Sequence, residues 1–396
     1  MKNKTVVLAY SGGLDTSYSL IKLSSNGCQV HAITINTGGF SIEEINEIKK
    51  KAFQLGAKKY KCIDAIKPFY NNIIKYLIFG NILKNNTYPL SVSSERIIQA
   101  IEIVNYSNKI KAKYISHGST GAGNDQVRFD QIFQILSPNT EIITLIRDNN
   151  ISREDEINYL QSKGLNIEWK KAKYSINKGL WGTSIGGSET LTSKLPLPEK
   201  VYPNQLKSKK EKKIKIEFKN GELVKINSKK DSPVNLIKYL QNIAEKYAIG
   251  RDIHVGDTII GIKGRVAFEA AAPLIIIKAH HLLEKHTLTK WQQFQKESIS
   301  NFYGMLLHEG QYFDPVMRNI ESFLINSQKN VSGTVYLKLK PYSFDLEGIK
   351  SKKDLMHGGF GTYGEINKNW TATDVKGFIK INANAGKIYH KINKEK

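Results

Sequence analysis

Cysteine and long hydrophobic runs are scarce in this chain of 396 residues, and each scarcity excludes a class of protein. Cys28 and Cys62 each stand alone in an apolar-periodic segment, which predicts reduced core residues of a cytoplasmic protein and not a disulfide framework. The longest apolar run, residues 270–277, is too short to span a bilayer, so no membrane partner is expected. The first four residues lead directly into a predicted strand, so no signal peptide is expected either.

Arginine is scarce as well, although the net charge is +23: seven arginines stand against 52 lysines. A strongly basic chain suggests a nucleic-acid function. Arginine, however, is the residue preferred for bidentate contacts to phosphates and bases, and the lysines are spread along the whole sequence. The composition therefore predicts a basic surface without a nucleic-acid partner.

Strands and helices alternate in the first part of the chain. Branched apolar runs predict strands at residues 6–9, 30–35, 59–63, 114–116 and 142–145. Helical periodicity predicts helices at residues 14–23, 42–55 and 94–112. A capping box from Ser152 to Asp155 predicts a further helix through residue 162. This alternation predicts an α/β fold, a parallel sheet with helices on both faces.

The pattern changes beyond Trp169, where we expect a second domain of α+β type. We place the boundary near residue 168, which gives domains at residues 1–168 and 169–396. A lysine-rich segment, residues 207–215, predicts a solvated linker or loop. Asn220 and Gly221 between two apolar runs predict a hairpin. Long helices are expected at residues 235–247, 271–285 and 290–308, followed by a β-like region from residue 331.

The stretch AYSGGLDTS, residues 9–17, lies between the first predicted strand and helix. Gly12 and Gly13 allow the backbone to approach an anion closely, and the first amides of the helix point into the turn. Three hydroxyl side chains could add donors, and Asp15 could hold a cation or a polar group. Ser-Gly-Gly alone is equally compatible with an ordinary strand-to-helix turn. In its context the stretch predicts a phosphate-binding loop that is not a Walker A loop, because the Gly-Lys-Ser/Thr ending is absent.

A second glycine-rich loop, HGSTGAGNDQVRFD at residues 117–130, follows the fourth predicted strand. Thr120, Asn124, Asp125 and Arg128 bring four different polar functions into it. Asn124 and Arg128 share one helix face if a helix starts near Asp125. A glycine-rich connection with a solvated end remains the alternative.

These motifs together resemble a known family. The first loop resembles the pyrophosphate-binding loop of the N-type ATP pyrophosphatases. With YPLSVSSERI, the residue 117–130 loop, SREDEI, YSINKGLWGTSIGGSETL, VGDTIIGIKGR and ATDVKGFIKINA, the chain resembles the argininosuccinate synthases over nearly its whole length. The resemblance implies an amino-terminal nucleotide-binding domain of the adenine nucleotide α-hydrolase type and a second domain for substrate binding and oligomerisation.

The resemblance also implies an activity. Such an enzyme is a ligase of arginine biosynthesis that joins L-citrulline to L-aspartate through citrullyl-AMP and releases AMP and pyrophosphate. ATP would be a substrate and Mg²⁺ would bridge its phosphates, with no metal ligand expected from protein side chains. The family implies a cytoplasmic homotetramer.

The site residues implied by the resemblance fall into three sets. ATP would contact Ala9, Tyr10, Ser11, Gly12, Gly13, Leu14, Asp15, Thr16, Ser17, Ile35 and Gly118. Citrulline would contact Tyr88, Ser93, Asn124, Arg128, Ser175 and Ser184, and aspartate would contact Thr120, Asn124 and Asp125. No catalytic residue is assigned, although Asp15, Asp125 and Arg128 are candidates.

One departure from the family pattern concerns the acceptor. Where familiar members place a Glu and a Tyr against citrulline, this chain has Gly256 and Phe268. Neither supplies a carboxylate or a hydroxyl. Either a neighbour such as Asp257 replaces them, or the acceptor site is reshaped.

Two other functions share some of these features. A tRNA-thiolating pyrophosphatase would need catalytic cysteines facing the ATP loop, and Cys28 and Cys62 fall on a predicted helix and strand instead. A nucleotide- or RNA-binding protein with a degenerate site is the non-enzymatic alternative. The presence of Asp15, Asp125 and Arg128 argues against such decay.

Three further patterns are not assigned to a site. Gly359, Gly361 and Gly364 spell G-x-G-x-x-G but lack a surrounding βαβ unit, so no dinucleotide site is expected. A helical cluster of ionisable residues predicts a solvated or interface face and not a metal site: His280, His281, Glu284 and His286. Trp291, Phe294 and Phe302 are predicted to pack between helices.

Overall fold

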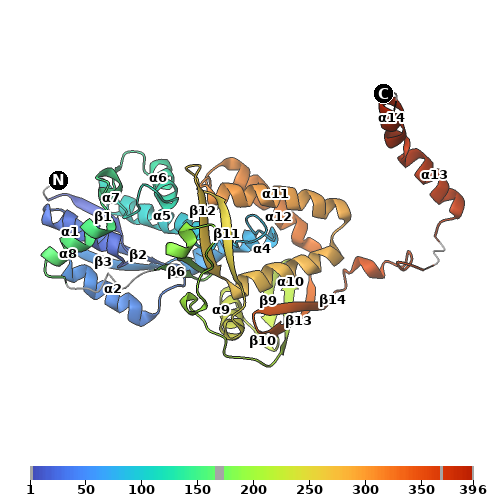
Figure 1. Ribbon diagram of the computed structural model, residues 1–396, viewed down its shortest axis with the longest axis horizontal. Coiled ribbons are helices and arrows are strands. Elements are labelled where there is room, and N and C mark those ends of the chain that lie inside the picture. Colours follow the sequence, from blue (N-terminus) through green and yellow to red (C-terminus); the bar gives the residue numbers. More distant parts are fainter. Residues whose placement is uncertain (1–2, 166–173, 366–368, 395–396) are drawn as a thin grey trace.

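The amino-terminal part is built on a parallel sheet, as predicted. The structure is a computed structural model that describes residues 3–165, 174–365 and 369–394 (Figure 1). Five strands lie in the order β3-β2-β1-β4-β5, and every neighbouring pair is parallel. Their bounds are β1 Thr5–Ala9, β2 Gln29–Asn36, β3 Lys59–Asp64, β4 Tyr114–Ser116 and β5 Glu141–Ile143. The last strand is shorter than predicted because a short helix, α7 (Leu145–Asp148), begins directly after Thr144.

Helices cover both faces of this sheet, because alternate strand residues point to opposite sides. The helices are α1 Leu14–Ser25, α2 Ile42–Gln54, α5 Ser91–Lys109, α6 Asp125–Leu136 and α8 Arg153–Ser162. Val6 and Leu8 of β1 pack in one buried cluster with α1 and α2, whereas Val7 packs in another with α5 and α6. The predicted capping box opens α8, since Ser152 Oγ accepts from the Asp155 amide and the Asp155 side chain accepts from the Ser152 amide. The predicted α/β fold is confirmed.

A helical run that was not predicted connects β3 to α5. It consists of α3 (Ile66–Phe69), a π-helical turn (Tyr70–Ile74) and α4 (Lys75–Phe79). Its apolar residues are buried in the main core. The loop that follows ends at Leu90, whose φ of 59° breaks the helical direction just before α5.

Two antiparallel sheets form the rest of the body. One has the order β11-β12-β7-β6, with β6 Ser175–Gly179, β7 Gly182–Gly186, β11 Arg251–Asp257 and β12 Lys263–Glu269. The other has the order β10-β9-β8-β13-β14, with β8 Lys212–Lys219, β9 Glu222–Ile226, β10 Lys229–Lys230, β13 Gly333–Lys340 and β14 Ser343–Lys350. Asn220 and Gly221 have φ values of 49° and 76°, so the predicted hairpin is confirmed.

The remaining helices pack on these sheets and on the first part. They are α9 Pro233–Ala244, α10 Ala271–Thr287, α11 Lys290–His308 and α12 Pro315–Ser327, with single 3₁₀ turns at Ser188–Leu191, Glu199–Val201, Glu245–Tyr247, Gln328–Asn330 and Leu355–His357. One continuous apolar core contains Ile33 of β2, Ile216 of β8 and Leu240 of α9. The predicted boundary at residue 168 lies outside the described residues, so the division into 1–168 and 169–396 remains a prediction.

The lysine-rich segment is only partly a linker. Residues 207–211 are irregular, but β8 begins at Lys212 and lies inside its sheet, paired with β9 and β13. Ile214, Ile216 and Phe218 are buried while Lys213 and Lys215 are exposed. The prediction of a loop through residue 215 was wrong because charge density hid the period-2 alternation of a strand.

The histidine cluster on α10 is not a solvated face. His280 and Glu284 are fully buried, and Lys296 of α11 forms an ion pair with Glu284 at 2.8 Å. The two ring nitrogens of His280 lie 2.6 and 2.9 Å from the side-chain oxygens of Asn81 and Gln328. That prediction was wrong for these two residues, because partners on other helices satisfy the polar atoms. His281 is exposed, as predicted.

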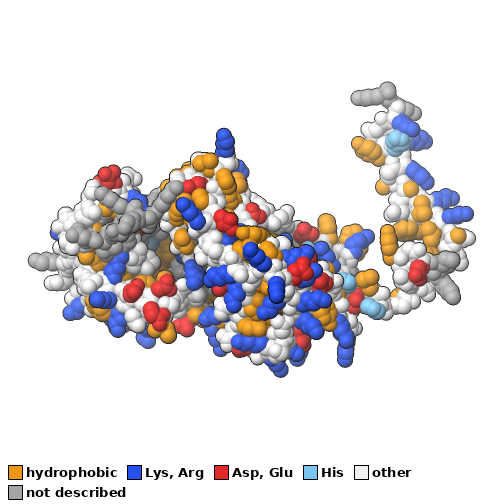
Figure 2. All heavy atoms as spheres, turned by 60° about the horizontal axis from the view of Figure 1, so that its bottom comes forward, with side chains coloured by type: hydrophobic (Ala, Val, Ile, Leu, Met, Phe, Trp, Pro, Cys, Tyr) orange, Lys and Arg blue, Asp and Glu red, His pale blue; other side chains and the backbone are white. Residues whose placement is uncertain are grey.

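The aromatic residues of α11 were also misplaced. The exposed fractions of Trp291, Phe294 and Phe302 are 69%, 67% and 43%, so none packs between helices of this chain. Beyond β14 the chain leaves the body as an arm that carries α13 (Ala372–Asn382) and α14 (Asn384–Asn393) (Figure 1). The arm is exposed along its length and carries apolar side chains, visible in orange in Figure 2.

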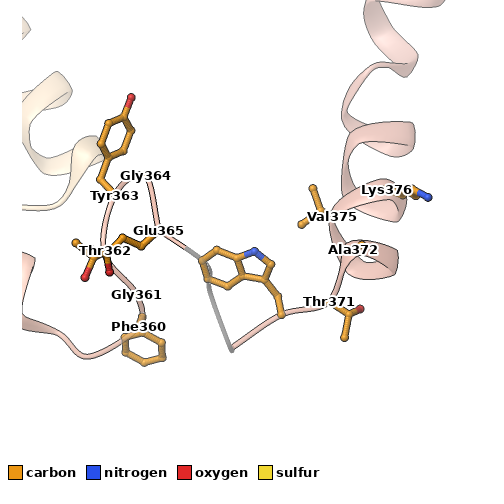
Figure 3. A pocket seen from close by; sticks show the side chains of 11 residues that line it. Phe360, Gly361, Thr362, Tyr363, Gly364, Glu365, Thr371, Ala372, Val375 and Lys376 are labelled. Carbon is orange, nitrogen blue, oxygen red and sulfur yellow. The ribbon is translucent and has the colours of Figure 1, made fainter.

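A hollow in this arm lies between the segment from Phe360 to Glu365 and the start of α13 (Figure 3). The glycines of the G-x-G-x-x-G string belong to this irregular segment, which follows a 3₁₀ turn and not a strand. The hollow is part of the arm and is remote from the two glycine-rich loops of the body (Figure 1).

The composition predicts a basic surface and two cysteines in the core. Lysine and arginine side chains are scattered over the face shown in Figure 2, among acidic ones. Cys28 is buried and Cys62 is half-buried, and no disulfide joins them. Within the described ranges, no helix is both long and apolar enough to cross a membrane.

Candidate active site

The loop between β1 and α1 has the geometry of an anion site. Gly12 has a φ of 77°, and a Cβ there would lie 3.0 Å from Ile48 of α2, so a side chain would be strained and crowded. Gly13, the residue before α1, provides no side-chain cap. The first helical hydrogen bond runs from the Ser17 amide to the Gly13 carbonyl, at 3.0 Å. The amides ahead of it are left for a ligand, and the helix dipole favours a negative one.

Seven of the nine residues of this loop fall into two groups, one accessible and one buried. The Ser11 hydroxyl is exposed and lies 3.2 Å from the Thr16 hydroxyl, so both groups are placed at the mouth of the loop. Tyr10, Leu14 and Ser17 are buried. Burial raises the pKa of Tyr10 to about 12. These three residues support the loop from below, and Ser11 through Gly13 with Thr16 form its accessible surface.

The second glycine-rich loop begins beside the first, because β4 pairs directly with β1. A Cβ on Gly118 would lie 3.1 Å from the carbonyl carbon of Asp15 and 3.1 Å from the Thr16 amide nitrogen. A side chain at this position would crowd the backbone of the first loop. Ile35, at the end of neighbouring β2, is buried, and Thr120 is exposed on the loop.

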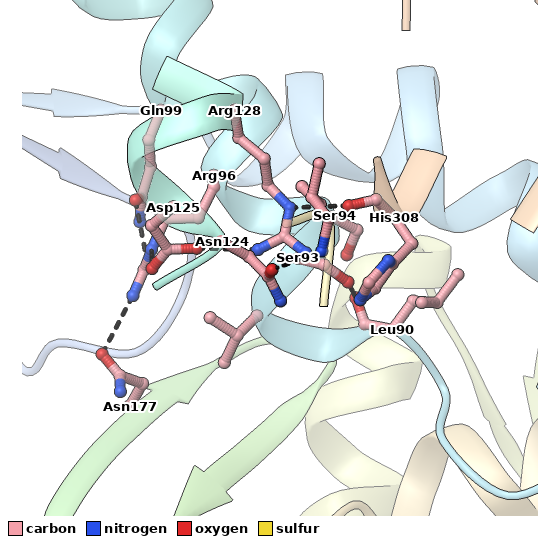
Figure 4. A network of polar contacts seen from close by, with 12 residues as sticks. Leu90, Ser93, Ser94, Arg96, Gln99, Asn124, Asp125, Arg128, Asn177 and His308 are labelled. Atoms are coloured by element: carbon pink, nitrogen blue, oxygen red, sulfur yellow. Dashed lines mark hydrogen bonds and ion pairs between the residues drawn. The ribbon is translucent and has the colours of Figure 1, made fainter. Parts of the chain in front are cut away.

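A chain of charged groups begins where this loop enters α6 (Figure 4). Asp125 accepts from Arg96 Nε at 2.9 Å and from Arg128 Nη1 at 2.8 Å. Arg128 Nε donates to the His308 carbonyl at 2.8 Å, and Arg96 Nη2 donates to Asn177 Oδ1 at 3.0 Å. Four separate elements thus hold the two guanidinium groups in fixed orientations.

This arrangement keeps one carboxylate ionised between two cations. Burial opposes ionisation of Asp125, but the charges of Arg96 and Arg128 outweigh it and lower the pKa of the carboxyl. Arg128 is 3% exposed, and its Nη2 contacts no acceptor among the described residues. The arrangement can therefore bind a further carboxylate at Arg128 and an amine at Asp125.

The other residues expected at citrulline lie around this chain. Tyr88 and Ser93 are buried at the start of α5, where the Tyr88 hydroxyl accepts from the Val92 amide at 3.0 Å. Ser184 is buried on β7 and pairs in register with Asn177 of β6, the partner of Arg96. Ser175 is exposed at the start of β6. The structure thus brings most of the set together and leaves Ser175 at the edge.

Asn124 links the two parts of the chain. Its side-chain oxygen accepts from the Ile259 amide at 2.8 Å, in the turn between β11 and β12. This contact fixes the end of the second glycine-rich loop from a segment that is remote in sequence.

Known proteins are similar to this chain in sequence. Residues 5–166 match the family description "Arginosuccinate synthase N-terminal HUP domain", and residues 174–389 match "Arginosuccinate synthase C-terminal domain". The argininosuccinate synthase of Methanocaldococcus jannaschii is 39% identical over 85% of this chain and 86% of its own length. That of Dictyoglomus turgidum is 37% identical over 96% of both. The chain belongs to the argininosuccinate synthase family.

Membership makes the chain an enzyme, a ligase of arginine biosynthesis. The similarity extends over whole chains, since the argininosuccinate synthase of Xanthomonas campestris is 31% identical over 100% of both. Among solved structures, a 4-thiouridine synthetase–RNA complex with bound ATP gives a TM-score of 0.31 at 10% identity and covers 41% of each chain, which is too low to support an argument.

Lys51 is a site residue that sequence reasoning missed. This residue of α2 donates to the Gly12 carbonyl at 2.6 Å, and burial lowers its pKa to about 8. It steadies the left-handed turn of the first loop from below. The run of three lysines in which it stands gave no sign of this role.

Asp15 faces α8. Its carboxyl interacts with that of Glu156, which is 2% exposed. Burial, followed by the charge of Asp15, raises the pKa of Glu156 to about 8, and burial also raises the pKa of Asp15. Burial thus disfavours the ionised form of both carboxyls, which places a second titratable group beside Asp15 at the start of α1.

His117 anchors the second loop and was also missed. Its Nδ1 accepts from the Ser119 amide at 3.1 Å, so Nε2 carries the proton and donates to Asp130 Oδ1 at 2.8 Å. Arg147 Nη1 in turn donates to Asp130 Oδ2 at 2.6 Å. The imidazole thereby orients the backbone next to Gly118. Arg96 was missed too, although SSERI was part of a recognised motif, because its partners are distant in sequence.

Proposed function

We propose that the protein condenses L-citrulline with L-aspartate to argininosuccinate and converts ATP to AMP and pyrophosphate. The observation that carries the proposal is the chain formed by Arg96, Asp125 and Arg128, one short loop away from an anion-binding turn. Guanidinium groups can bind the carboxylates of two amino acids, an ionised carboxylate can bind an amine, and unpaired backbone amides can bind the phosphates of a nucleotide.

ATP would occupy residues 9–17, with Ile35 and Gly118 beside it. The leading amides of α1 and the hydroxyls of Ser11 and Thr16 would receive the phosphates. Mg²⁺ would be held mainly by phosphate oxygens, because no group of three or more His, Cys, Asp or Glu side chains in the described ranges could hold a metal. When bound, it would neutralise phosphate charge.

The amino acids would lie on the other side of the second loop. Aspartate would contact Thr120, Asn124 and Asp125, and citrulline would contact Tyr88, Ser93, Asn124, Arg128, Ser175 and Ser184. The ureido oxygen of citrulline would attack the α-phosphorus with loss of pyrophosphate, giving citrullyl-AMP. The aspartate amine would then attack the ureido carbon with loss of AMP and a proton. No side chain becomes covalently attached, so the rate would come from alignment and from electrostatic stabilisation of phosphate charge.

The test is pyrophosphate release from ATP and Mg²⁺, with citrulline and aspartate added singly and together. We expect release to depend on a citrulline, and argininosuccinate to form only when aspartate is also present. Release that needs no ureido acceptor would contradict the proposal. A tRNA-thiolating activity is not favoured by any observation, since Cys28 and Cys62 lie outside both glycine-rich loops.

The proposal extends to a homotetramer in the cytoplasm. Two exposed apolar surfaces support assembly. One lies on the arm and includes Trp370 and Phe378, and the other lies on α11 and includes Trp291 and Phe294. Burying such side chains against other copies would remove them from water. Light scattering of the full chain should give four copies, and removal of residues 358–396 should give a smaller species. A monomeric full chain would refute the assembly.

A further inference from the structure

Four basic side chains meet beside Asp125, and we call Lys84, Arg128, His254 and His308 the basic cluster. They come from the loop before α5, from α6, from β11 and from the end of α11. His254 and His308 are each 6% exposed. Two hydrogen bonds join these segments: Arg128 Nε donates to the His308 carbonyl at 2.8 Å, and Asn85, next to Lys84, donates from Nδ2 to the carbonyl of Val255, next to His254, at 3.0 Å. Burial lowers the pKa of His308 to about 3, with Arg128, Lys84 and His254 as further causes. Burial and then Lys84 lower the pKa of His254 to about 4.

The basic cluster has unused hydrogen-bonding capacity. Nδ1 of His254 and Nδ1 of His308 are buried without a hydrogen-bond partner in the part of the chain that the structure describes. Lys84 is half-buried and forms no side-chain hydrogen bond or ion pair with a described residue. Buried polar atoms normally have hydrogen-bond partners, so the two unpartnered imidazole nitrogens indicate that a ligand supplies them.

Few carboxylates balance these groups. Asp125 is already shared by two arginines, and Asp257 pairs with Lys263 at 2.7 Å. Glu309 and Asp257 act on Lys84 electrostatically, and Asp252 acts on His254, without a direct ion pair to either residue among the described residues. Because burial lowers the pKa of His254 to about 4 and that of His308 to about 3, both imidazoles are neutral at pH 7, and the positive charge beside Arg128 comes from Lys84.

Neither Gly256 nor Phe268 supplies an acidic group to this side. A Cβ on Gly256 would lie 2.8 Å from His254 Nε2 and 3.3 Å from Asn85 Nδ2, so the imidazole occupies the space that a side chain at 256 would take. Phe268 is fully buried, with its ring centre 5.4 Å from that of Tyr88, and it offers no hydroxyl. An imidazole thus stands where the family pattern would place a carboxylate.

We propose that the acceptor preferred by this site is a citrulline whose α-nitrogen is acylated and therefore uncharged, with its carboxylate on Arg128 and its acyl group against His254, His308 and Lys84. This inference rests on the proposed function and specifies only the acceptor. The α-nitrogen of citrulline is two bonds away from the carboxylate carbon. If the carboxylate binds Arg128, an α-ammonium would therefore lie in a region that already contains Arg128 and Lys84. Like charges at this distance repel, and burial strengthens the repulsion. An amide has no charge, and its carbonyl oxygen can accept from an imidazole or from Lys84.

The test compares three acceptors with the full-length wild-type protein: citrulline, Nα-acetylcitrulline and Nα-succinylcitrulline. Pyrophosphate release is measured with saturating ATP, Mg²⁺ and aspartate, and the condensed product is identified from its mass by mass spectrometry. We expect kcat/KM for at least one acylated acceptor to exceed that for citrulline by tenfold or more. A kcat/KM for citrulline equal to or above both would overturn this inference and leave the proposed function intact. Release with none of the three would instead refute the proposed function.

A double variant designed to reverse the acceptor preference tests whether the basic cluster causes it. His254→Val/Gly256→Glu removes the imidazole, frees the space beside residue 256 and adds a carboxylate for an α-ammonium. The ratio of kcat/KM for the acylated acceptor to that for citrulline should fall at least tenfold. Val255→Glu is the matched control, because Val255 is 52% exposed on the opposite face of the same strand. An equal change of the ratio in both variants would contradict the assignment to the basic cluster.

Discussion

Replacing Arg128 by lysine tests whether this guanidinium orients the acceptor. The wild-type side chain uses Nε for the His308 carbonyl and Nη1 for Asp125, both at 2.8 Å, and these two bonds aim Nη2 at the site. Lysine keeps the charge but has one nitrogen on a flexible stem, so it cannot satisfy both partners and a substrate carboxylate in one plane. At least one charge-assisted hydrogen bond is lost, and such a bond contributes about 1.5–3 kcal/mol. Since about 1.4 kcal/mol is tenfold, we expect the KM for the acceptor to rise about 10- to 100-fold.

The assay is steady-state pyrophosphate release over a series of acceptor concentrations at saturating ATP and aspartate. Arg318→Lys is the matched control, because Arg318 pairs with Glu321 within α12 and should leave the acceptor KM unchanged. Thermal unfolding of both variants shows whether the substitution of the buried Arg128 has destabilised the fold. A folded Arg128→Lys protein with the wild-type acceptor KM would refute the assignment of Arg128 to the acceptor carboxylate.

Three further predictions concern the first loop and its support. Asp15→Ala should abolish pyrophosphate release, and unchanged turnover would remove Asp15 from the site. Because the folded pKa of Glu156 is raised to about 8, its stabilising contribution is complete below its unfolded pKa and is lost as the pH rises towards 8. The melting temperature should therefore fall between pH 5 and pH 8.5, and fall less in Glu156→Gln; equal slopes would contradict the raised pKa. Gly12→Ala, with a φ of 77° and Ile48 at 3.0 Å, should destabilise the fold by about 1–2 kcal/mol in urea unfolding, and an unchanged midpoint would exclude the strain.

The elements that could be predicted from the sequence are those with local signals. The strand, glycine turn and helix around residues 5–25 follow from neighbouring residues, and the capping box at Ser152 fixed the start of α8 within one turn. The positions of Gly118 and Asp125 beside the first loop also follow, because parallel strands bring their carboxyl ends to one edge.

What could not be predicted depends on contacts between distant segments. Helical spacing correctly places His280 and Glu284 on one face, but whether that face is exposed or buried depends on Lys296 of another helix. The same limit applies to Trp291, whose spacing suits a packed face although its side chain is 69% exposed. Arg96 was overlooked because its role comes from Asp125 and Asn177, which are 29 and 81 residues away.

The links that reach across the chain have a consequence for the order of protein synthesis. Arg128 is held by His308, Arg96 by Asn177, and Asn124 by Ile259. When only the first 165 residues have been translated, the chain contains the whole glycine-rich turn of residues 9–17 but none of the three residues that hold Arg128, Arg96 and Asn124. A partly translated chain can therefore present a nucleotide cradle before it has an ordered place for the amino acids. Completion of the polypeptide, and not of its first half, is what aligns the groups that would use the nucleotide.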